Sequence, residues 1–262
     1  MATVLVTSAA GAPGVTATAV GLALIWPSPV LLADCDRTPS QAVLAGYLRG
    51  TDAGGLGLTG LARAHREGRP LSQAVAGETI PLALGGVRRD FLPGFATPGA
   101  AALFDPAWSG LGAAFASLGE AGVDVIVDAG RSGAHGPPSG VLTHADAVLV
   151  VTRTHLPALS ALRLHLPVLR ESVERLRGSS DGVGLVLVGE GQPYTADEIR
   201  SQFGVRIWGA LPDDPCGAAV LAQGAPEPRR YGDSRYLRAV RTLSSVVVAH
   251  LHHQRLRIAG AA

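Results

Sequence analysis

Lysine and asparagine are both absent from this chain of 262 residues, whose 22 Lys-or-Arg positions are all arginine. The chain also holds 34 glycines and much alanine, so the absence fits the codon bias of a GC-rich genome. Its chemical consequence is that no lysine can supply positive charge to a phosphate site. Charged residues are scarce, at 16%, and the formal net charge is +1. This balance argues against nucleic-acid binding driven by global charge, and we find no specific nucleic-acid signal.

Cysteine is also rare. Cys35 and Cys216 are far apart, have no metal-ligand spacing and are too few for a disulfide framework, which indicates a reducing compartment. No basic segment precedes the first β-like run, as it would in a secretion signal. No apolar run reaches the roughly 18 residues of a membrane span. We therefore expect a cytoplasmic protein.

Hydrophobic residues make up 47% of the chain, which is enough for a sizeable core. Unbroken Val/Leu/Ile runs alternate with helical stretches, and strands covered by helices on both faces have this composition. We therefore predict a three-layer α/β fold with a doubly wound, mostly parallel sheet, in one domain over residues 1–262. The expected strands are Thr3–Thr7, Val30–Ala33, Val123–Asp128, Ala147–Val151, Gly184–Val188 and Arg206–Ala210. The expected helices are Val15–Ile25, Leu103–Ala121, Leu156–Leu176, Ala196–Phe203 and Ser234–Gln254.

The glycine-rich segment from Ala53 to Ala102 has a weaker pattern. We expect helices near Gly57–His65 and Pro70–Val75, followed by an edge strand near Ile80–Leu84.

The stretch LVTSAAGAPGVTATAVGLAL, Leu5 to Leu24, consists of a β-like run, a loop of small residues and a helix. A P-loop has this layout, because backbone N–H groups and the start of the helix hold phosphate oxygens. In a P-loop a lysine reaches the outer phosphates and a Ser or Thr hydroxyl binds Mg²⁺. Gly11, Gly14 and Thr16 are in the right order, but Val15 stands where the lysine is expected. Taken alone, the loop could equally be an ordinary β–α turn.

The loop resembles the deviant P-loop of the ParA/MinD ATPases, whose pattern is K-G-G-x-G-K-[ST]. On this pattern Ala10 takes the place of the signature lysine, Val15 that of the second lysine, and Thr16 that of the Mg²⁺ ligand. Both lysines are therefore replaced. The resemblance implies that the phosphates are held by Gly11, Ala12, Pro13, Gly14, Val15, Thr16 and Ala17.

Later motifs follow in the order of the same family. PVLLADCDRTPS, with Asp34 and Asp36, resembles the family's D-x-D motif, and GVDVIVDAGRSG ends a strand with Asp128 as the Walker B aspartate does. The resemblance implies catalytic roles for these three aspartates and Mg²⁺ binding by Thr16 and Asp128. The alternative for Asp34 and Asp36 is a capped strand end. VRIWGALPDDP resembles the family's late strand, which ends in a proline-aspartate turn, and the resemblance implies that Pro212 lies beside the nucleotide base.

The similarity extends through FLPGFATPG and ADAVLVVTRTHLPALSALR and covers Thr3 to about Leu251, but two departures matter. Gly189 and Glu190 stand where the family often has an asparagine near the base. The loss of two lysine charges predicts slow hydrolysis, because one such electrostatic contact commonly contributes about 10²–10³ in rate. Arg131 and Arg153 are at the expected carboxyl edge of the sheet, and either replaces a lysine or is a solvated loop residue.

The last expected helix carries an apolar stripe with spacings of three and four residues. We expect the stripe to pack on the sheet; the alternative is a peripheral membrane contact, as MinD-type proteins make with a C-terminal amphipathic helix. The stripe consists of Tyr236, Val240, Leu243, Val247 and Leu251.

From this resemblance we expect a degenerate ParA/MinD-like positioning or scaffold protein with weak or no ATP hydrolysis. It would act as a homodimer or with a protein partner, in the manner of the localisation proteins of Tad-type pilus and secretion systems. Its ligand would be ATP or ADP with Mg²⁺, or none if the loop is a remnant. The alternative is an active ATPase in which an arginine replaces the P-loop lysines; a relative of dethiobiotin synthetase is a third reading.

Overall fold

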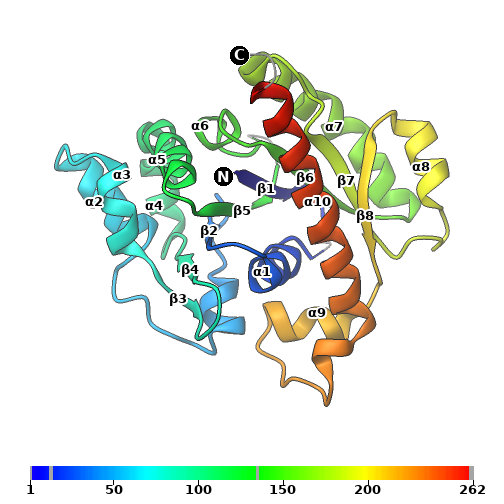
Figure 1. The fold of residues 1–262 in the computed structure, drawn as a ribbon, viewed down its shortest axis with the longest axis horizontal. Coiled ribbons are helices and arrows are strands. Elements are labelled where there is room, and N and C mark those ends of the chain that lie inside the picture. Colours follow the sequence, from blue (N-terminus) through cyan, green and yellow to red (C-terminus); the bar gives the residue numbers. More distant parts are fainter. Residues whose placement is uncertain (1, 12–13, 134–135, 260–262) are drawn as a thin grey trace.

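The structure, a computed structural model, describes residues 2–11, 14–133 and 136–259. Its centre is an eight-stranded sheet in the order β3-β4-β2-β5-β1-β6-β7-β8, with helices on both faces (Figure 1). Neighbouring strands are parallel, except that β3 runs antiparallel to β4. The strands are β1 Thr3–Ser8, β2 Val30–Asp34, β3 Ile80–Ala83, β4 Arg89–Leu92, β5 Asp124–Arg131, β6 Ala147–Arg153, β7 Val183–Val188 and β8 Arg206–Leu211.

Helices fill the connections between the strands. The α-helices are α1 Val15–Ile25, α2 Leu58–Arg66, α3 Leu71–Ala74, α4 Pro98–Leu103, α5 Trp108–Glu120, α6 Ser139–Leu142, α7 Leu156–Arg177, α8 Ala196–Phe203, α9 Pro215–Ala222 and α10 Arg235–Ala259. A π-helical turn, η1, spans Val43–Tyr47, and short 3₁₀ turns are η2 Val75–Glu78, η3 Asp105–Ala107 and η4 Tyr231–Asp233.

The sheet separates two apolar cores, because successive side chains of a strand point to opposite faces. In β1, Leu5 belongs to one core, and Val4 and Val6 belong to the other. Helices α2 to α8 cover the first face, whereas α1, α9, α10 and η1 cover the second. This three-layer arrangement confirms the predicted fold class.

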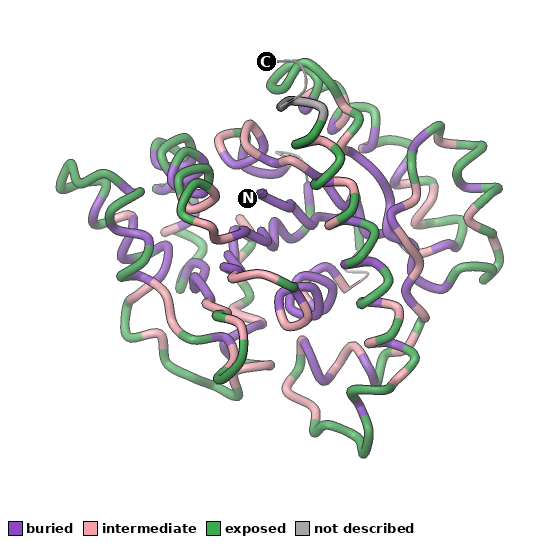
Figure 2. The backbone as a smooth tube through the Cα atoms, viewed as in Figure 1, coloured by how far each residue is buried: buried purple, intermediate pink, exposed green. Residues whose placement is uncertain are grey.

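Helix α1 is buried on almost every side (Figure 2). Its sequence is apolar all round, as expected of a helix enclosed by other elements. It lies between the sheet and α10, and Gly21 permits the contact, since an added Cβ there would be 3.2 Å from Val240 Cγ1.

The C-terminal apolar stripe, Tyr236 to Leu251, is buried at all five of its positions and packs against α1 and β8. The expectation that it packs on the sheet is confirmed. A membrane contact through this stripe is ruled out in this conformation, because its side chains are enclosed within the second core. Among the described residues, no helix combines the length and apolar character needed to cross a membrane.

All six expected parallel strands are present, and the bounds predicted for α1 and α8 are those observed. The elements that were not predicted include β4, α6, α9 and η1. The helix expected at Leu103–Ala121 corresponds mainly to α5, which begins later, at Trp108, after the end of α4 and the 3₁₀ turn η3. The edge strand near Ile80 is confirmed as β3, and its partner in the sheet is the unpredicted β4.

Candidate functional site

The carboxyl ends of the strands meet above α1 at a cleft of about 550 Å³. In open α/β sheets ligands bind at this edge, where the strand connections diverge. In this sheet β1 lies between β5 and β6. The strand β2 lies on the β5 side of β1, whereas β7 and β8 lie on the β6 side, so the strand order reverses beside β1. Of the residues expected in a nucleotide site, the cleft is lined by Gly14, Val15, Thr16, Ala17, Asp36, Arg131 and Pro212.

The glycines of the loop have backbone angles that other residues rarely adopt. Gly11 has φ +74°, and Gly14, which begins α1, has φ +95°. A Cβ on either residue would meet no atom within 4 Å, so neither glycine is needed for close packing. The space beside them is open, as backbone binding of a phosphate requires. Ala12 and Pro13 lie outside the described residues.

Val15 and Thr16 begin α1 and face different surroundings. Val15 is 6% exposed and belongs to the second core, although it also borders the cleft. Thr16 is partly exposed in the cleft, beside Asp128. The position of the missing lysine is therefore occupied by an apolar contact, while the expected Mg²⁺ ligand keeps its place.

Asp34 and Asp128 are register partners on the adjacent strands β2 and β5, and both are buried. Burial raises the pKa of Asp34 to about 8, and the nearby Asp128 carboxylate adds to this rise. Burial also raises the pKa of Asp128 to about 6, although the Thr16 hydroxyl and the Gly130 N–H, which donates across 3.0 Å, oppose the shift. Burial therefore favours the protonated form of both carboxyls, and more strongly that of Asp34.

The segment around Gly94 approaches the Asp34 side chain closely, because glycine has no Cβ. A Cβ on Gly94 would lie 2.6 Å from the Asp34 carboxyl carbon, so the LPG stretch packs directly on that side chain. Asp34 also accepts a hydrogen bond from the Asp36 N–H at 3.2 Å. Neither Asp34 nor Asp128 lines the cleft itself, and both lie beneath its surface residues.

Asp36 is the partly exposed member of the acidic group and lines the cleft. Its carboxylate accepts the Thr38 N–H at 2.7 Å and lies against Gly130, where an added Cβ would be 2.1 Å from its carboxyl carbon. Burial raises the pKa of Asp36, whereas the Arg131 guanidinium lowers it. Arg131 at the end of β5 therefore has a carboxylate nearby that offsets its charge.

Arg153, at the end of β6, also borders the cleft and is paired. Its Nη1 lies 2.8 Å from Asp213 Oδ2, which follows β8. The prediction that Arg131 and Arg153 gather at this edge agrees with their positions. Arg153 is therefore engaged by an aspartate, whereas Arg131 is exposed and has Asp36 nearby without an ion pair among the described residues.

Several residues of the cleft carried no recognised sequence signal. Tyr236 of α10 and Ala218, Ala222 and Gln223 near α9 form one wall, and the segment from Thr38 to Ala42 forms another. Alanines and a core tyrosine have no motif, and α9 itself was not predicted. Glu190, which replaces the family's asparagine, does not line the cleft; its Oε1 accepts the Ala196 N–H at 3.2 Å.

No protein-family model matches the chain, and no curated protein matches it in sequence. Solved structures match it over nearly its whole length. The ParA family ATPase of Chlorobium tepidum TLS is 18% identical with a TM-score of 0.72, and the match covers 96% of this chain and 99% of that one. The fold is the ParA/MinD type of P-loop NTPase fold.

Two further ParA/MinD-type structures support the assignment. The MinC:MinD cell division protein complex of Aquifex aeolicus gives a TM-score of 0.69 at 14% identity, over 95% of this chain and 96% of that one. The septum site-determining protein MinD complexed with Mg-ADP from Pyrococcus horikoshii OT3 gives 0.62 at 16% identity, over 93% and 94%. Identities this low show the shared fold alone.

The donor set of the ParA/MinD-like cleft suits Mg²⁺ better than a softer metal. Thr16 and Asp36 offer a hydroxyl and a carboxylate at the cleft, with Asp128 beside Thr16, and Mg²⁺ prefers such oxygen ligands. Within the described part of the chain, no three His, Cys, Asp or Glu side chains are placed to hold a metal by themselves. Mg²⁺ usually keeps several waters and binds nucleotide phosphates, so it needs few protein ligands.

Proposed function

We propose that this chain is a ParA/MinD-like positioning or scaffold protein whose cleft binds a Mg²⁺-nucleotide and hydrolyses it weakly or not at all. The observation that carries the proposal is the contrast within one loop. Gly11 and Gly14 are open and suitably bent and Thr16 lies beside Asp128, whereas Val15 is buried in the core.

Each part of the cleft would have a separate task. The N–H groups at the start of α1 would hold phosphate oxygens, and the Thr16 hydroxyl would bind Mg²⁺ while donating its proton to Asp128. Mg²⁺ would supply positive charge that offsets both the phosphates and the aspartates. Pro212, at the far wall of the cleft, would contact the base.

Slow hydrolysis follows from the missing charges. Phosphoryl transfer depends on positioning and on stabilising negative charge in the transition state. Losing one preorganised electrostatic contact commonly lowers the rate by about 10²–10³, and Ala10 and Val15 replace two. Arg153 is held by Asp213, which weighs against its replacing a P-loop lysine in an active ATPase, and the charge of Arg131 is partly offset by the nearby Asp36 carboxylate.

A scaffold acts by contact, so we propose a homodimer or a complex with another subunit in the cytoplasm. The neighbour from Aquifex aeolicus is a complex of MinD with MinC, which gives a precedent for partner binding by this fold. Resemblance to the localisation proteins of Tad-type pilus and secretion systems supports a positioning role.

The burial of Val15 favours a second candidate, a cleft that has lost nucleotide altogether. Val15 packs in the second core as an apolar residue would in a simple β–α turn. In that case the buried aspartates would serve the fold alone, and the protein would work as a scaffold without a ligand.

Calorimetric titration with ADP and ATP, with and without Mg²⁺, separates these functions. We expect saturable binding that strengthens with Mg²⁺, and loss of this Mg²⁺ dependence in Thr16→Val, which keeps the side-chain shape. No heat with either nucleotide would support the ligand-free scaffold instead. Steady-state turnover at the rate of an activated ParA-type ATPase, abolished by Asp128→Ala, would contradict slow hydrolysis.

A further inference from the structure

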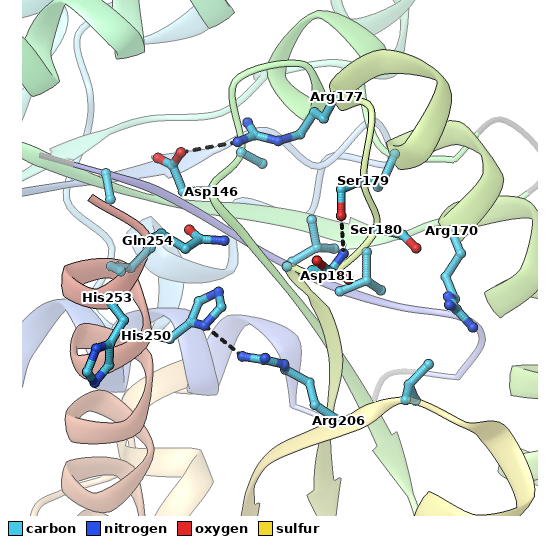
Figure 3. A pocket seen from close by; sticks show the side chains of 18 of the residues that line it. Asp146, Arg170, Arg177, Ser179, Ser180, Asp181, Arg206, His250, His253 and Gln254 are labelled. Carbon is cyan, nitrogen blue, oxygen red and sulfur yellow. Dashed lines mark hydrogen bonds and ion pairs between the residues drawn. The ribbon is translucent and has the colours of Figure 1, made fainter. Parts of the chain in front are cut away.

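A second cavity lies at the opposite edge of the sheet from the nucleotide-like cleft. We call this space, of about 900 Å³, the amino-edge cavity, because it borders the amino ends of β1, β6, β7 and β8. The last turns of α7 and of α10 complete its walls (Figure 3). Cavities of this size accommodate small molecules rather than single ions.

The walls of the amino-edge cavity carry more positive than negative charge. Four arginines and two aspartates line it. Arg177 is paired with Asp146 at 3.3 Å, and Arg255 lies 3.7 Å from Asp124. In the part of the chain that the structure describes, Arg170 and Arg206 form no ion pair with a carboxylate.

Arg206 is held in one orientation by two neighbours. Its guanidinium carbon lies 4.7 Å from the centre of the Trp208 ring, which is a cation–π contact. Its Nη1 lies 2.8 Å from His250 Nδ1, and Figure 3 shows this contact at the wall formed by α10. Trp208 is itself fixed by its indole N–H, which donates to the Val148 carbonyl at 3.3 Å. The guanidinium is therefore preorganised, which lowers the entropy lost when a ligand binds.

The same contact fixes the tautomer of His250. Arginine only donates hydrogen bonds, so His250 Nδ1 must accept, and in the neutral ring the proton is on Nε2. Burial and the nearby Arg206 lower the pKa of His250, which favours that neutral ring. Among the described groups, the buried Nε2 has no hydrogen-bond partner. An unpaired buried donor is costly, and a ligand oxygen would satisfy it.

We propose that the amino-edge cavity binds a small molecule bearing a phosphate or carboxylate group, through Arg206, Arg170 and the Nε2–H of His250. Arginine forks match the geometry of both oxyanions. Asp181, which also lines the cavity, forms no ion pair with any described residue and would repel a simple anion. A ligand that also carries a hydroxyl or amine would use Asp181 as an acceptor. The site is separate from the nucleotide cleft, so its existence does not depend on the proposed function.

The test is calorimetric titration of the whole protein with sodium pyrophosphate and, separately, with citrate, in metal-free buffer of low ionic strength. We expect saturable binding of at least one probe, and the comparison shows whether phosphate or carboxylate is preferred. Arg206→Gln and Arg170→Gln should each weaken binding about tenfold, as the loss of a charge-assisted contact does. His250→Phe keeps a ring against Trp208 and should weaken binding by removing the donor.

Two further variants serve as controls for the effect of charge on binding. Asp181→Asn should tighten binding, since it removes a repelling charge, whereas Arg163→Gln, on an exposed part of α7 outside the cavity, should have no effect. Arg131→Gln tests whether the probes bind in the nucleotide cleft, and binding at the amino-edge cavity should survive it. Arg206→Lys keeps the charge without the fork, and melting curves verify that each variant is folded. Absence of saturable binding, or binding lost in Arg131→Gln but unchanged in Arg206→Gln, would overturn the proposal.

Discussion

At the scale of single residues, Val15 both packs in the second core and borders the cleft, at the position where a P-loop has its lysine. Lysine there would lose apolar contacts in the second core, but its long stem can reach the cleft that Val15 already borders. We expect Val15→Lys to bind MgATP about tenfold more tightly and to unfold at a lower temperature. Val15→Met, which also lengthens the side chain but adds no charge, is the control for affinity. Unchanged affinity in Val15→Lys would mean that the loop backbone no longer fits a phosphate.

Asp34 and Asp128 make the stability of the protein depend on pH. Their folded pKa values are about 8 and about 6, against 3.8 for a free aspartate. The folded chain therefore binds these protons more tightly than the unfolded chain, and the free energy of unfolding falls as pH rises from 3.8 through both values. In EDTA, we expect the Tm of the wild type to fall from about pH 6 to about pH 9 by roughly 5 °C more than that of Asp34→Asn.

Mg²⁺ supplies the control for this pH effect. A cation at the cleft offsets the negative charge of the aspartates, so Mg²⁺ at about pH 9 should raise the Tm of the wild type more than that of Asp34→Asn. Thermal unfolding followed by circular dichroism measures both effects. Parallel pH curves for the two proteins in EDTA would show that Asp34 ionises freely in the fold.

Which residues gather at the cleft could be predicted from motif order, because strand ends of a parallel sheet share an edge. Thr16, Asp36, Arg131 and Pro212 all line it. Their environments could not be predicted in the same way. The ion pair of Arg153 with Asp213 depends on side-chain positions that a linear motif does not encode, and so does the burial that raises the pKa of Asp34.

At the scale of elements, α10 offers two adjacent valines in opposite environments. Val247 is fully buried in the second core, and Val246 is 42% exposed. We expect Val247→Ala to lower the free energy of unfolding by about 2 kcal/mol, from lost burial and a residual cavity. Val246→Ala should change it by less than about 0.5 kcal/mol. Urea denaturation measures both, and equal effects would mean that α10 is not docked on the sheet as described.

The elements that were predicted well carry local signals, and those missed do not. Helix α8 is capped at its N-terminus by Thr195, whose side chain forms a capping box with Glu198. It is capped at its C-terminus by Gly204, which has φ +60°. These residues fix both ends within the segment itself. Strand β4 has the sequence RDFL, and its role depends on pairing with the distant β2 and β3. Such long-range pairing leaves little trace in four residues.

At the scale of the whole molecule, the sheet separates two candidate sites that have different chemistry. The carboxyl edge holds the acidic cleft of Thr16, Asp36 and the buried aspartates, which calls for a cation. The amino edge holds Arg170 and Arg206, which form no ion pair among the described residues and call for an anion. Helix α10 spans both, since Tyr236 lines the cleft and His250 lines the amino-edge cavity. A single helix therefore contacts both candidate sites.

Association is the property of the whole molecule that the proposed scaffold requires. The ParA/MinD resemblance implies dimers that meet face to face across the nucleotide clefts, where Ala10 replaces a lysine and is exposed. We expect sedimentation velocity to show a dimer that becomes more populated with MgATP. Ala10→Glu would place like charges near the symmetry axis and should leave the protein monomeric, because like charges across an interface disfavour association. Ala76→Glu, at an exposed alanine of η2 outside the cleft, is the matched control and should still dimerise.

A monomer at every concentration, with no partner co-purifying from the native host, would contradict the scaffold role. A dimer insensitive to Ala10→Glu would instead place the contact away from the cleft.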